Sequence, residues 1–145
     1  MLNIIGIIKA AVLNGTPLLF GTSGEILTQK SGNMNLGVEG LMFMGGAFGL
    51  AGAYAYSTVA GDAASGVAAI IVALVCAFVS GFFGSLIFSF LTVTLKANQN
   101  VTGLALTIFG TGVGQFVGEV MRIRIGGNVT IPNALKNAFV RPIMP

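Results

Sequence analysis

The chain has 145 residues, of which 54% are hydrophobic and 8% are charged, against about 25% charged residues in a soluble domain. The net charge of +3 comes from basic residues that form no dense run, which excludes a typical nucleic-acid-binding surface. With no His and one Cys, the sequence predicts no metal site, no cofactor and no disulfide framework, and its composition is that of a membrane protein.

The first apolar segment covers residues 2–20, which is just long enough for a membrane-spanning helix of about 20 residues. Lys9 lies near its middle, where a charge costs about 2.5–3.5 kcal/mol on insertion scales. The Lys9 side chain is expected either to face protein or to extend to the membrane surface. Pro17 is expected to kink or end this helix near Gly15.

A polar, glycine-rich stretch follows at residues 21–49 and carries Glu25, Lys30 and Glu39. Lipid cannot satisfy the polar groups of a broken backbone, so such a stretch is expected to line a cavity or pack against protein. The sequence therefore predicts a broken or re-entrant polar segment between the first two spans, with a turn at residues 30–33. Glu25 and Lys30 are expected to pair across that turn.

Three further apolar segments cover residues 41–59, 67–94 and 101–117. Together with the first they predict an all-α, polytopic transmembrane helix bundle of about four spans within residues 1–120. Glu119 and Arg122 are expected to form a solvated pair at the end of the last span. Residues 121–145 are expected to be an extramembrane polar segment, with a short amphipathic helix near residues 133–140.

Small residues recur at four-residue spacing in the last three spans, which places them on one face of each helix. Such faces let helix backbones approach closely in membranes, so they predict a compact bundle. The alternative is that glycine is simply common in membrane helices. The glycines expected to mediate helix packing are Gly45, Gly49, Gly81, Gly110, Gly114 and Gly118.

The orientation of the spans is predicted from their short connections. Lys30 and Lys96 lie in connections separated by two spans, hence on the same side of the membrane, whereas the connection between them carries Asp62 and no basic residue. Because basic residues favour the cytoplasmic side, Lys30 and Lys96 are expected there. The basic residues after position 120 favour the opposite orientation.

Two motifs resemble a known family. Residues 24–46, G-E-I-L-T-Q-K-S-G-N-M-N-L-G-V-E-G-L-M-F-M-G-G, closely resemble the signature of ABC importer permeases for simple sugars, nucleosides and branched-chain amino acids. Residues 96–106, K-A-N-Q-N-V-T-G-L-A-L, are similar to the family's K-x-N-Q-x-V-x-G-L-A-L. The form of the first motif is most similar to the nucleoside or simple-sugar branch.

The resemblance implies a permease subunit of an ABC importer for nucleosides or simple sugars in the plasma membrane, for instance the bacterial inner membrane. It implies a cytoplasmic ABC ATPase, a second permease subunit and an extracytoplasmic substrate-binding lipoprotein as partners, besides the lipid bilayer. Such permeases are roughly twice as long, and the sequence has no match to their G-x-N-x-x-A-A-x-x-A-G segment, which docks on the ATPase. The chain is therefore expected to be the N-terminal half of a permease.

Five polar residues are candidates for the substrate pathway or gate. Amides and a carboxylate can hydrogen-bond to the hydroxyls of a sugar or ribose, and Asn35 and Glu39 share a helical face if the second helix starts early. The structural alternative is that Asn33 caps the second helix and Glu39 favours its N-terminus through the helix dipole. Residues 98–102 are expected to shape a cytoplasmic gate or to be a plain loop and cap. The candidates are Asn33, Asn35, Glu39, Asn100 and Thr102.

The alternatives to a permease are a channel, a truncated permease and an enzyme. A small homo-oligomeric channel would be built from four spans around Asn35 and Glu39, and would conduct without an ATPase. A truncated permease would carry the motifs without a function of its own. An enzyme needs a nucleophile and base or a metal cluster, which a sequence without His does not offer.

Overall fold

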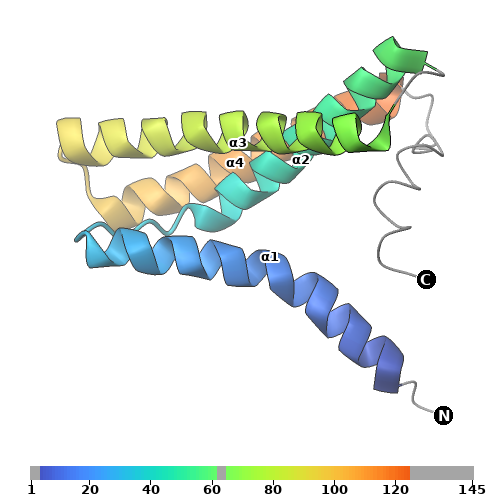
Figure 1. Cartoon of the computed structure of the whole chain (residues 1–145). Helices are drawn as coiled ribbons and strands as arrows, with labels where there is room; N and C mark the ends of the chain where they lie inside the picture. The colour runs from blue at the N-terminus through green and yellow to red at the C-terminus, as the bar shows by residue number, and fades with distance from the viewer. Residues whose placement is uncertain (1–3, 62–64, 125–145) are drawn as a thin grey trace.

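The computed structural model describes residues 4–61 and 65–124, and these form long helices joined by short connections (Figure 1). The helices are α1 (Ile4–Lys30), α2 (Val38–Ala60), α3 (Gly66–Ser89) with the π-helical turn η2 (Phe90–Thr94), and α4 (Gln99–Arg124). Within these residues four helices are long and apolar enough to cross a membrane, the third being α3 together with η2. The predicted all-α, four-span bundle is confirmed. The helix expected near residues 133–140 lies outside the described residues.

The predicted break between the first two spans is much shorter than the polar stretch itself. α1 continues through Pro17 as far as Lys30, so only residues 31–37 are non-helical. The helix tolerates its polar residues because their hydroxyls donate to carbonyls one turn earlier, for example Ser23 Oγ to Leu19 O at 2.7 Å and Thr28 Oγ1 to Gly24 O at 3.0 Å. α1 bends part-way along (Figure 1), which is what an internal proline causes. Pro17 therefore does not end the helix.

The longer α1 changes the interpretation of Lys9. Lys9 and Lys30 are separated by 21 residues, or about 31 Å at 1.5 Å per residue. The hydrocarbon core of a bilayer is about 30 Å thick, so one helix can bring the two ammonium groups to opposite surfaces. Lys9 is exposed in the structure. This spacing favours the expectation that its side chain extends to the membrane surface.

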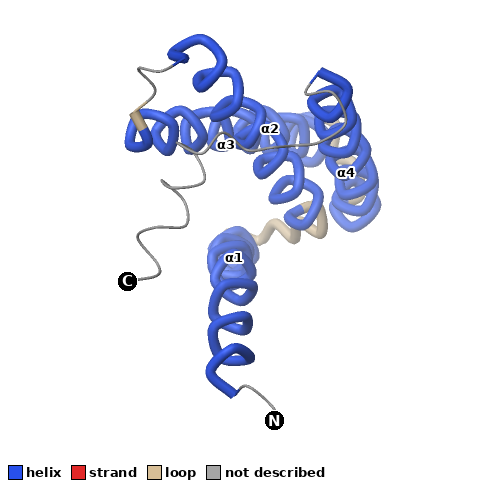
Figure 2. Tube along the Cα trace, turned by 90° about the vertical axis from the view of Figure 1, so that its right-hand side faces the viewer, coloured by secondary structure: helices blue, strands red, loops and turns tan. Residues whose placement is uncertain are grey.

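α2 is the central helix of the bundle. It packs against α3 and α4 along much of its length, whereas α1 touches chiefly α2 and contributes no buried residue (Figure 2). α1 approaches α2 at Gly21, where a Cβ would lie 2.5 Å from Sδ of the flexible Met42 side chain. The connections that follow α1 and η2 lie at the same end of the bundle (Figure 1), so Lys30 and Lys96 lie on the same side. That this side is cytoplasmic remains a prediction.

The backbones of α2 and α4 cross in direct contact. A Cβ on Gly110 would lie 2.5 Å from Gly40 O, and a Cβ on Gly40 would lie 2.6 Å from Thr107 Cα. Nearer the start of α4, a Cβ on Gly103 would lie 2.7 Å from Leu36 N. Only glycine allows two helices to approach so closely, because any other residue places a Cβ in the other backbone. This crossing fixes the start of α2 and the preceding segment against α4.

The glycines expected to mediate packing divide into two groups. Gly45 and Gly49 face α3, where their Cβ positions would lie 3.6 Å from Ala77 O and 3.1 Å from Ala73 O, and Gly110 and Gly114 face α2. Added Cβ atoms on Gly81 and Gly118 would meet no atom within 4 Å, so no close helix approach within the described residues requires a glycine at these two positions. The buried residues of α3 lie on another face of that helix, namely Ala69, Ser80, Gly84 and Phe88.

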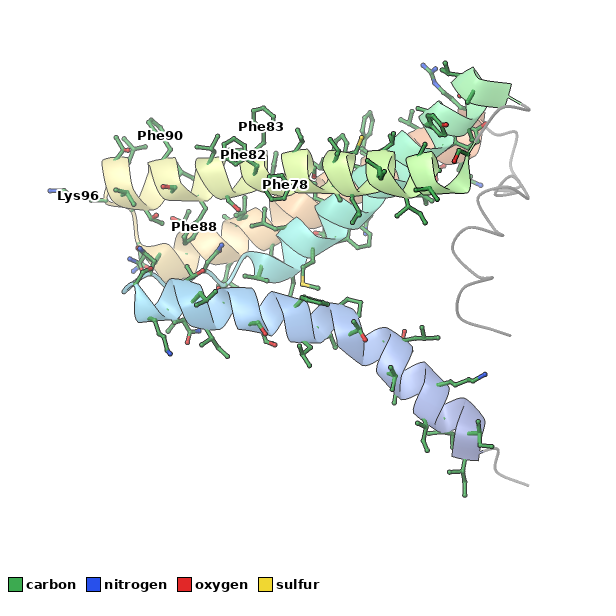
Figure 3. All side chains as sticks on the ribbon, in the orientation of Figure 1. Phe78, Phe82, Phe83, Phe88, Phe90 and Lys96 are labelled. Carbon is green, nitrogen blue, oxygen red and sulfur yellow. The ribbon has the colours of Figure 1, made fainter. Side chains whose placement is uncertain are left out.

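The connection between η2 and α4 contains a strained residue. Lys96 has a φ of +52°, and it is the one non-glycine residue with positive φ among those described. Its side chain points away from the helices (Figure 3). A Cβ in this left-handed region costs about 1–2 kcal/mol. The Lys96 side chain has no ion pair with the residues that the structure describes, whereas the backbone conformation favours glycine.

Lys96→Gly is therefore expected to stabilise the protein by about 0.5–1 kcal/mol, because it removes the Cβ from a left-handed conformation. The measurement is thermal unfolding of the full-length protein in detergent. Lys96→Ala is the control, since it removes the charge and keeps the Cβ. A stabilisation shared equally by both variants would show that the charge, and not the backbone conformation, sets the effect.

Candidate functional site

The non-helical segment 31–37 is held to α4 by side chains rather than by backbone pairing. Gln99 uses both ends of its amide: its Oε1 accepts from Met34 N at 2.9 Å, and its Nε2 donates to Asn33 Oδ1 at 3.0 Å. Thr107 Oγ1 donates to Leu36 O at 2.9 Å. Backbone groups without a helical partner must be satisfied in some other way inside a membrane. Two side chains of α4 bond such groups here: Gln99 accepts from Met34 N, and Thr107 donates to Leu36 O.

The same segment is held to α1 by Glu25. Glu25 Oε1 accepts from Asn35 N at 3.0 Å and from Gln29 Nε2 at 3.3 Å. Asn35 is buried, and its Oδ1 accepts from Gly37 N at 2.9 Å, which fixes the turn into α2. The second oxygen, Glu25 Oε2, is buried and has no hydrogen-bond partner within the described residues. The sequence had predicted a pair between Glu25 and Lys30. In the structure Glu25 instead orders the segment by accepting from Asn35 N.

A groove of about 230 Å³ lies between α1 and the start of α2, beside this segment. Asn35, which precedes α2, and Glu39, in its first turn, both line the groove although they do not belong to one continuous helix. Glu39 is exposed, and its carboxylate has no hydrogen bond or ion pair to the residues that the structure describes. The full lining is Leu18, Gly21, Thr22, Glu25, Asn35, Leu36, Val38, Glu39 and Met42.

Both motifs thus meet at one end of a four-span helix bundle, where residues of the first motif line the groove and Gln99 of the second holds segment 31–37. The sequence matches the family described as "Branched-chain amino acid transport system / permease component" over residues 6–140. The chain belongs to this permease family. It is a family of transporter membrane subunits rather than enzymes, and its members and the four apolar helices place the chain in the plasma membrane as a multi-pass protein.

Two curated relatives of this permease are named as ABC transporter permeases. This chain is 34% identical over 114 residues to TsgC13 of Haloferax volcanii, which is named for glucose. The alignment covers 79% of this chain and 31% of the relative. This chain is 28% identical over 111 residues to NupQ of Bacillus subtilis, which is named for guanosine. The alignment covers 77% of this chain and 33% of the relative. The permease chain therefore spans about a third of the length of these relatives. No solved structure matches it significantly.

The candidate site residues of the permease are only partly brought together. Asn35 and Glu39 share the groove, and Asn33 lies in the adjoining segment with its side chain bonded to Gln99. The suggestion that Asn33 caps α2 is wrong, because the N-cap is Gly37 and the Asn33 side chain accepts from Gln99 instead. Glu39 does lie in the first turn of α2, so its interaction with the helix dipole remains compatible with the structure.

Asn100 and Thr102 lie outside the groove. The Asn98 side chain caps α4, accepting from Asn100 N at 3.0 Å and from Val101 N at 3.3 Å. Asn100 itself is exposed, whereas Thr102 is buried. The cap and loop expected for this region are therefore present, and a contribution of Asn100 or Thr102 to a gate remains a prediction.

Two residues of the site were not among the sequence candidates. Glu25 lies in the first motif but seemed to be a partner for Lys30, and Thr107 follows the second motif directly. Thr107 could not be singled out, because its contact with Leu36 joins residues 71 positions apart. Glu25 could have been recognised as a site residue, because it is a charged residue near the end of an apolar helix.

A second, larger cavity of about 490 Å³ lies among α2, α3 and α4. Its lining is almost entirely apolar and includes Phe48, Phe83 and Phe109. Ser80 Oγ, which belongs to the same lining, is buried and has no hydrogen-bond partner within the described residues. This cavity offers few groups that could bind a hydroxylated substrate, so the groove beside segment 31–37 is the better candidate site.

Proposed function

We propose that this chain is the N-terminal membrane part of a permease subunit of an ABC importer, and that it forms part of the translocation pathway for a nucleoside or a simple sugar. The observation that carries the proposal is that the family's first motif brings Glu25, Asn35 and Glu39 together in one groove between two spans. The relatives named for glucose and guanosine support the two substrate classes. Family membership favours a permease over a self-assembling channel.

The proposed importer has further subunits. A cytoplasmic ABC ATPase supplies the energy, a second permease subunit completes the pathway, and an extracytoplasmic binding lipoprotein delivers the substrate. The permease itself makes and breaks no covalent bond. Its contribution is to offer hydrogen-bonding groups in an otherwise apolar environment, and to change which side of the membrane they face.

The groups of the groove suit a hydroxylated substrate. Glu39 offers a carboxylate without a hydrogen-bond partner within the described residues, and Glu25 Oε2 is a buried acceptor that also lacks one. Asn35 uses its Oδ1 for Gly37 N, which leaves its amide nitrogen as a donor. Sugar and ribose hydroxyls both donate and accept, so this combination can bind them without a counter-charge.

The size of the groove indicates that it is one part of a larger site. Its volume of about 230 Å³ lies below the range of about 300–1,000 Å³ that is usual for complete ligand pockets. In the proposed importer the remaining walls come from the second permease subunit and from parts of the permease that the relatives have and this chain does not span. The groove then supplies one wall of the pathway.

The proposal is tested by uptake of labelled guanosine and glucose into cells that express the full-length permease with its neighbouring transport genes. Glu39→Gln is expected to raise the KM for uptake by about tenfold, since it weakens a hydrogen bond to a charged acceptor by about 1.4 kcal/mol. Glu119→Gln is the matched control, because Glu119 is exposed and pairs with Arg122, with 3.0 Å between Nε and Oε2.

Co-purification provides a second test of the same proposal. The tagged permease is expected to bring down an ATPase and a second permease subunit from its native membrane. Conductance by the purified permease alone, without any ATPase, would instead support a channel. Uptake of neither substrate class, with the subunits present, would remove the assignment to nucleosides or simple sugars.

A further inference from the structure

Segment 31–37 is held by two helices that are not neighbours in the sequence. Glu25 on α1 accepts from Asn35 N, whereas Gln99 on α4 bonds both Met34 N and the Asn33 side chain. α1 has few other contacts with the bundle, since it touches chiefly α2 and has no buried residue. The segment is therefore the main polar connection between α1 and α4.

We propose that Gln99 is a positioning residue, whose amide holds segment 31–37 against α4 and thereby sets the shape of the groove that Asn35 and Glu39 line. This inference rests on the proposed function, because it assigns Gln99 a part in presenting the groove to substrate. Gln99 does not itself line the groove. It acts through Met34 N and Asn33, which lie one and two residues before Asn35.

The geometry suits a contact that is made in one state of a transporter and broken in another. Both bonds of Gln99 are between neutral groups, at 2.9 and 3.0 Å, and neutral hydrogen bonds contribute little net free energy compared with those of charged groups. By contrast, Gly103 and Gly110 bring the α4 backbone against Leu36 and Gly40 in a tight apolar contact. The polar contact of Gln99 can therefore open while the glycine crossing stays closed.

The direction of the hydrogen bonds provides a specific test. In N33D the introduced carboxylate still accepts from Gln99 Nε2. In Q99E the introduced carboxylate still accepts from Met34 N, and the Asn33 amide can rotate so that its nitrogen donates to the other oxygen. In the double variant N33D/Q99E both facing groups are acceptors, so the contact between the side chains is lost.

The experiment uses the full-length permease in its importer and measures uptake kinetics for N33D, Q99E and the double variant. Each single variant is expected to change the KM by less than about threefold, whereas the double variant raises it by more than about tenfold. K96Q and K96Q/Q99E are the controls, because Lys96 is exposed, its side chain points away from the helices (Figure 3), and K96Q changes the net charge by the same amount as N33D without touching the segment. Additive effects in N33D/Q99E, equal to those of the controls, would overturn the proposal.

A second readout does not depend on the substrate. Thr22 is exposed and lines the groove, so T22C in a C76S background reports the shape of the groove by its rate of maleimide labelling. The double variant is expected to change this rate several-fold relative to T22C alone, whereas the Lys96 control variants are expected to leave it unchanged. If the permease takes up neither substrate, the proposed function fails while the labelling still tests Gln99.

Acidic pH distinguishes loss of the contact from misfolding. Two facing carboxyl groups can share one proton, which restores a donor between them. The labelling rate of T22C in N33D/Q99E is therefore expected to return toward that of T22C alone as the pH falls from about 8 to about 5, each compared at the same pH. A rate that is changed at neutral pH and stays changed in acid would contradict the assignment of Gln99.

Discussion

Gly110→Ala is expected to force α2 and α4 apart and to lower the stability of the permease by about 1–3 kcal/mol, the usual cost of overpacking. The added Cβ would lie 2.5 Å from Gly40 O and 2.6 Å from Gly40 C. Both are backbone atoms within a helix, so no side chain can rotate away to make room. The two helices themselves must move, and the movement spreads along their contact.

The measurement is thermal unfolding of the full-length protein in detergent, with Gly112→Ala as the matched control. Gly112 lies on the same helix, and an added Cβ there would meet no atom within 4 Å. Alanine is the better helix former, so the control is expected to lose no stability. Equal destabilisation by both substitutions would contradict the close backbone crossing between α2 and α4.

The fold class could be predicted from the sequence because it depends on composition along the chain. Four apolar segments separated by charged or glycine-rich connections lead directly to four spans. The boundary of the first span could not be predicted in the same way. Residues such as Thr22, Ser23 and Thr28 read as a polar break, but in a helix their hydroxyls bond to the preceding turn and the helix continues to Lys30.

The packing faces show a similar limit. Gly45 and Gly49 face α3 and Gly110 and Gly114 face α2, each pair at the spacing of four from which helix packing was expected. In α3 small residues recur on more than one face, and the sequence alone favoured the face of Gly81. The structure buries Gly84 instead, because Leu41 and Met44 of α2 lie against that position. Which of two small-residue faces of a helix is buried can be predicted only when the position of the partner helix is known.

The site was the least predictable part of the molecule. The two motifs contain many of the residues that form it, but the contact between Gln99 and Asn33 joins positions 66 residues apart. Local reasoning offered Asn33 either a place in the substrate pathway or a helix cap, since asparagine before a helix often caps it. Its actual partner follows from how α4 crosses α2, and that crossing is a tertiary property.

The second large effect is expected at Glu25, where Glu25→Leu would remove the acceptor for Asn35 N. Asn35 is only 9% exposed, so its N–H would be left without a partner and the cost is about 1–3 kcal/mol. Segment 31–37 would lose its side-chain hydrogen bond to α1 and keep only the backbone bonds at the end of that helix, and the groove would lose one of its polar groups. Uptake is expected to fall more than about tenfold, with reduced thermal stability of the purified protein.

Glu25→Gln separates the two tasks of this carboxyl group. The glutamine keeps an oxygen for Asn35 N, so the stability is expected to be retained, whereas the buried Oε2 is replaced by a nitrogen that can only donate. If Oε2 accepts a hydrogen bond from a substrate hydroxyl, the KM for uptake rises about tenfold while the protein stays as stable as the native one. Native uptake by Glu25→Gln together with loss of uptake in Glu25→Leu would assign Glu25 to the support of segment 31–37 alone. The outcome thus decides whether Glu25 Oε2 contacts the transported molecule, or whether only Oε1 has a role, as the acceptor for Asn35 N.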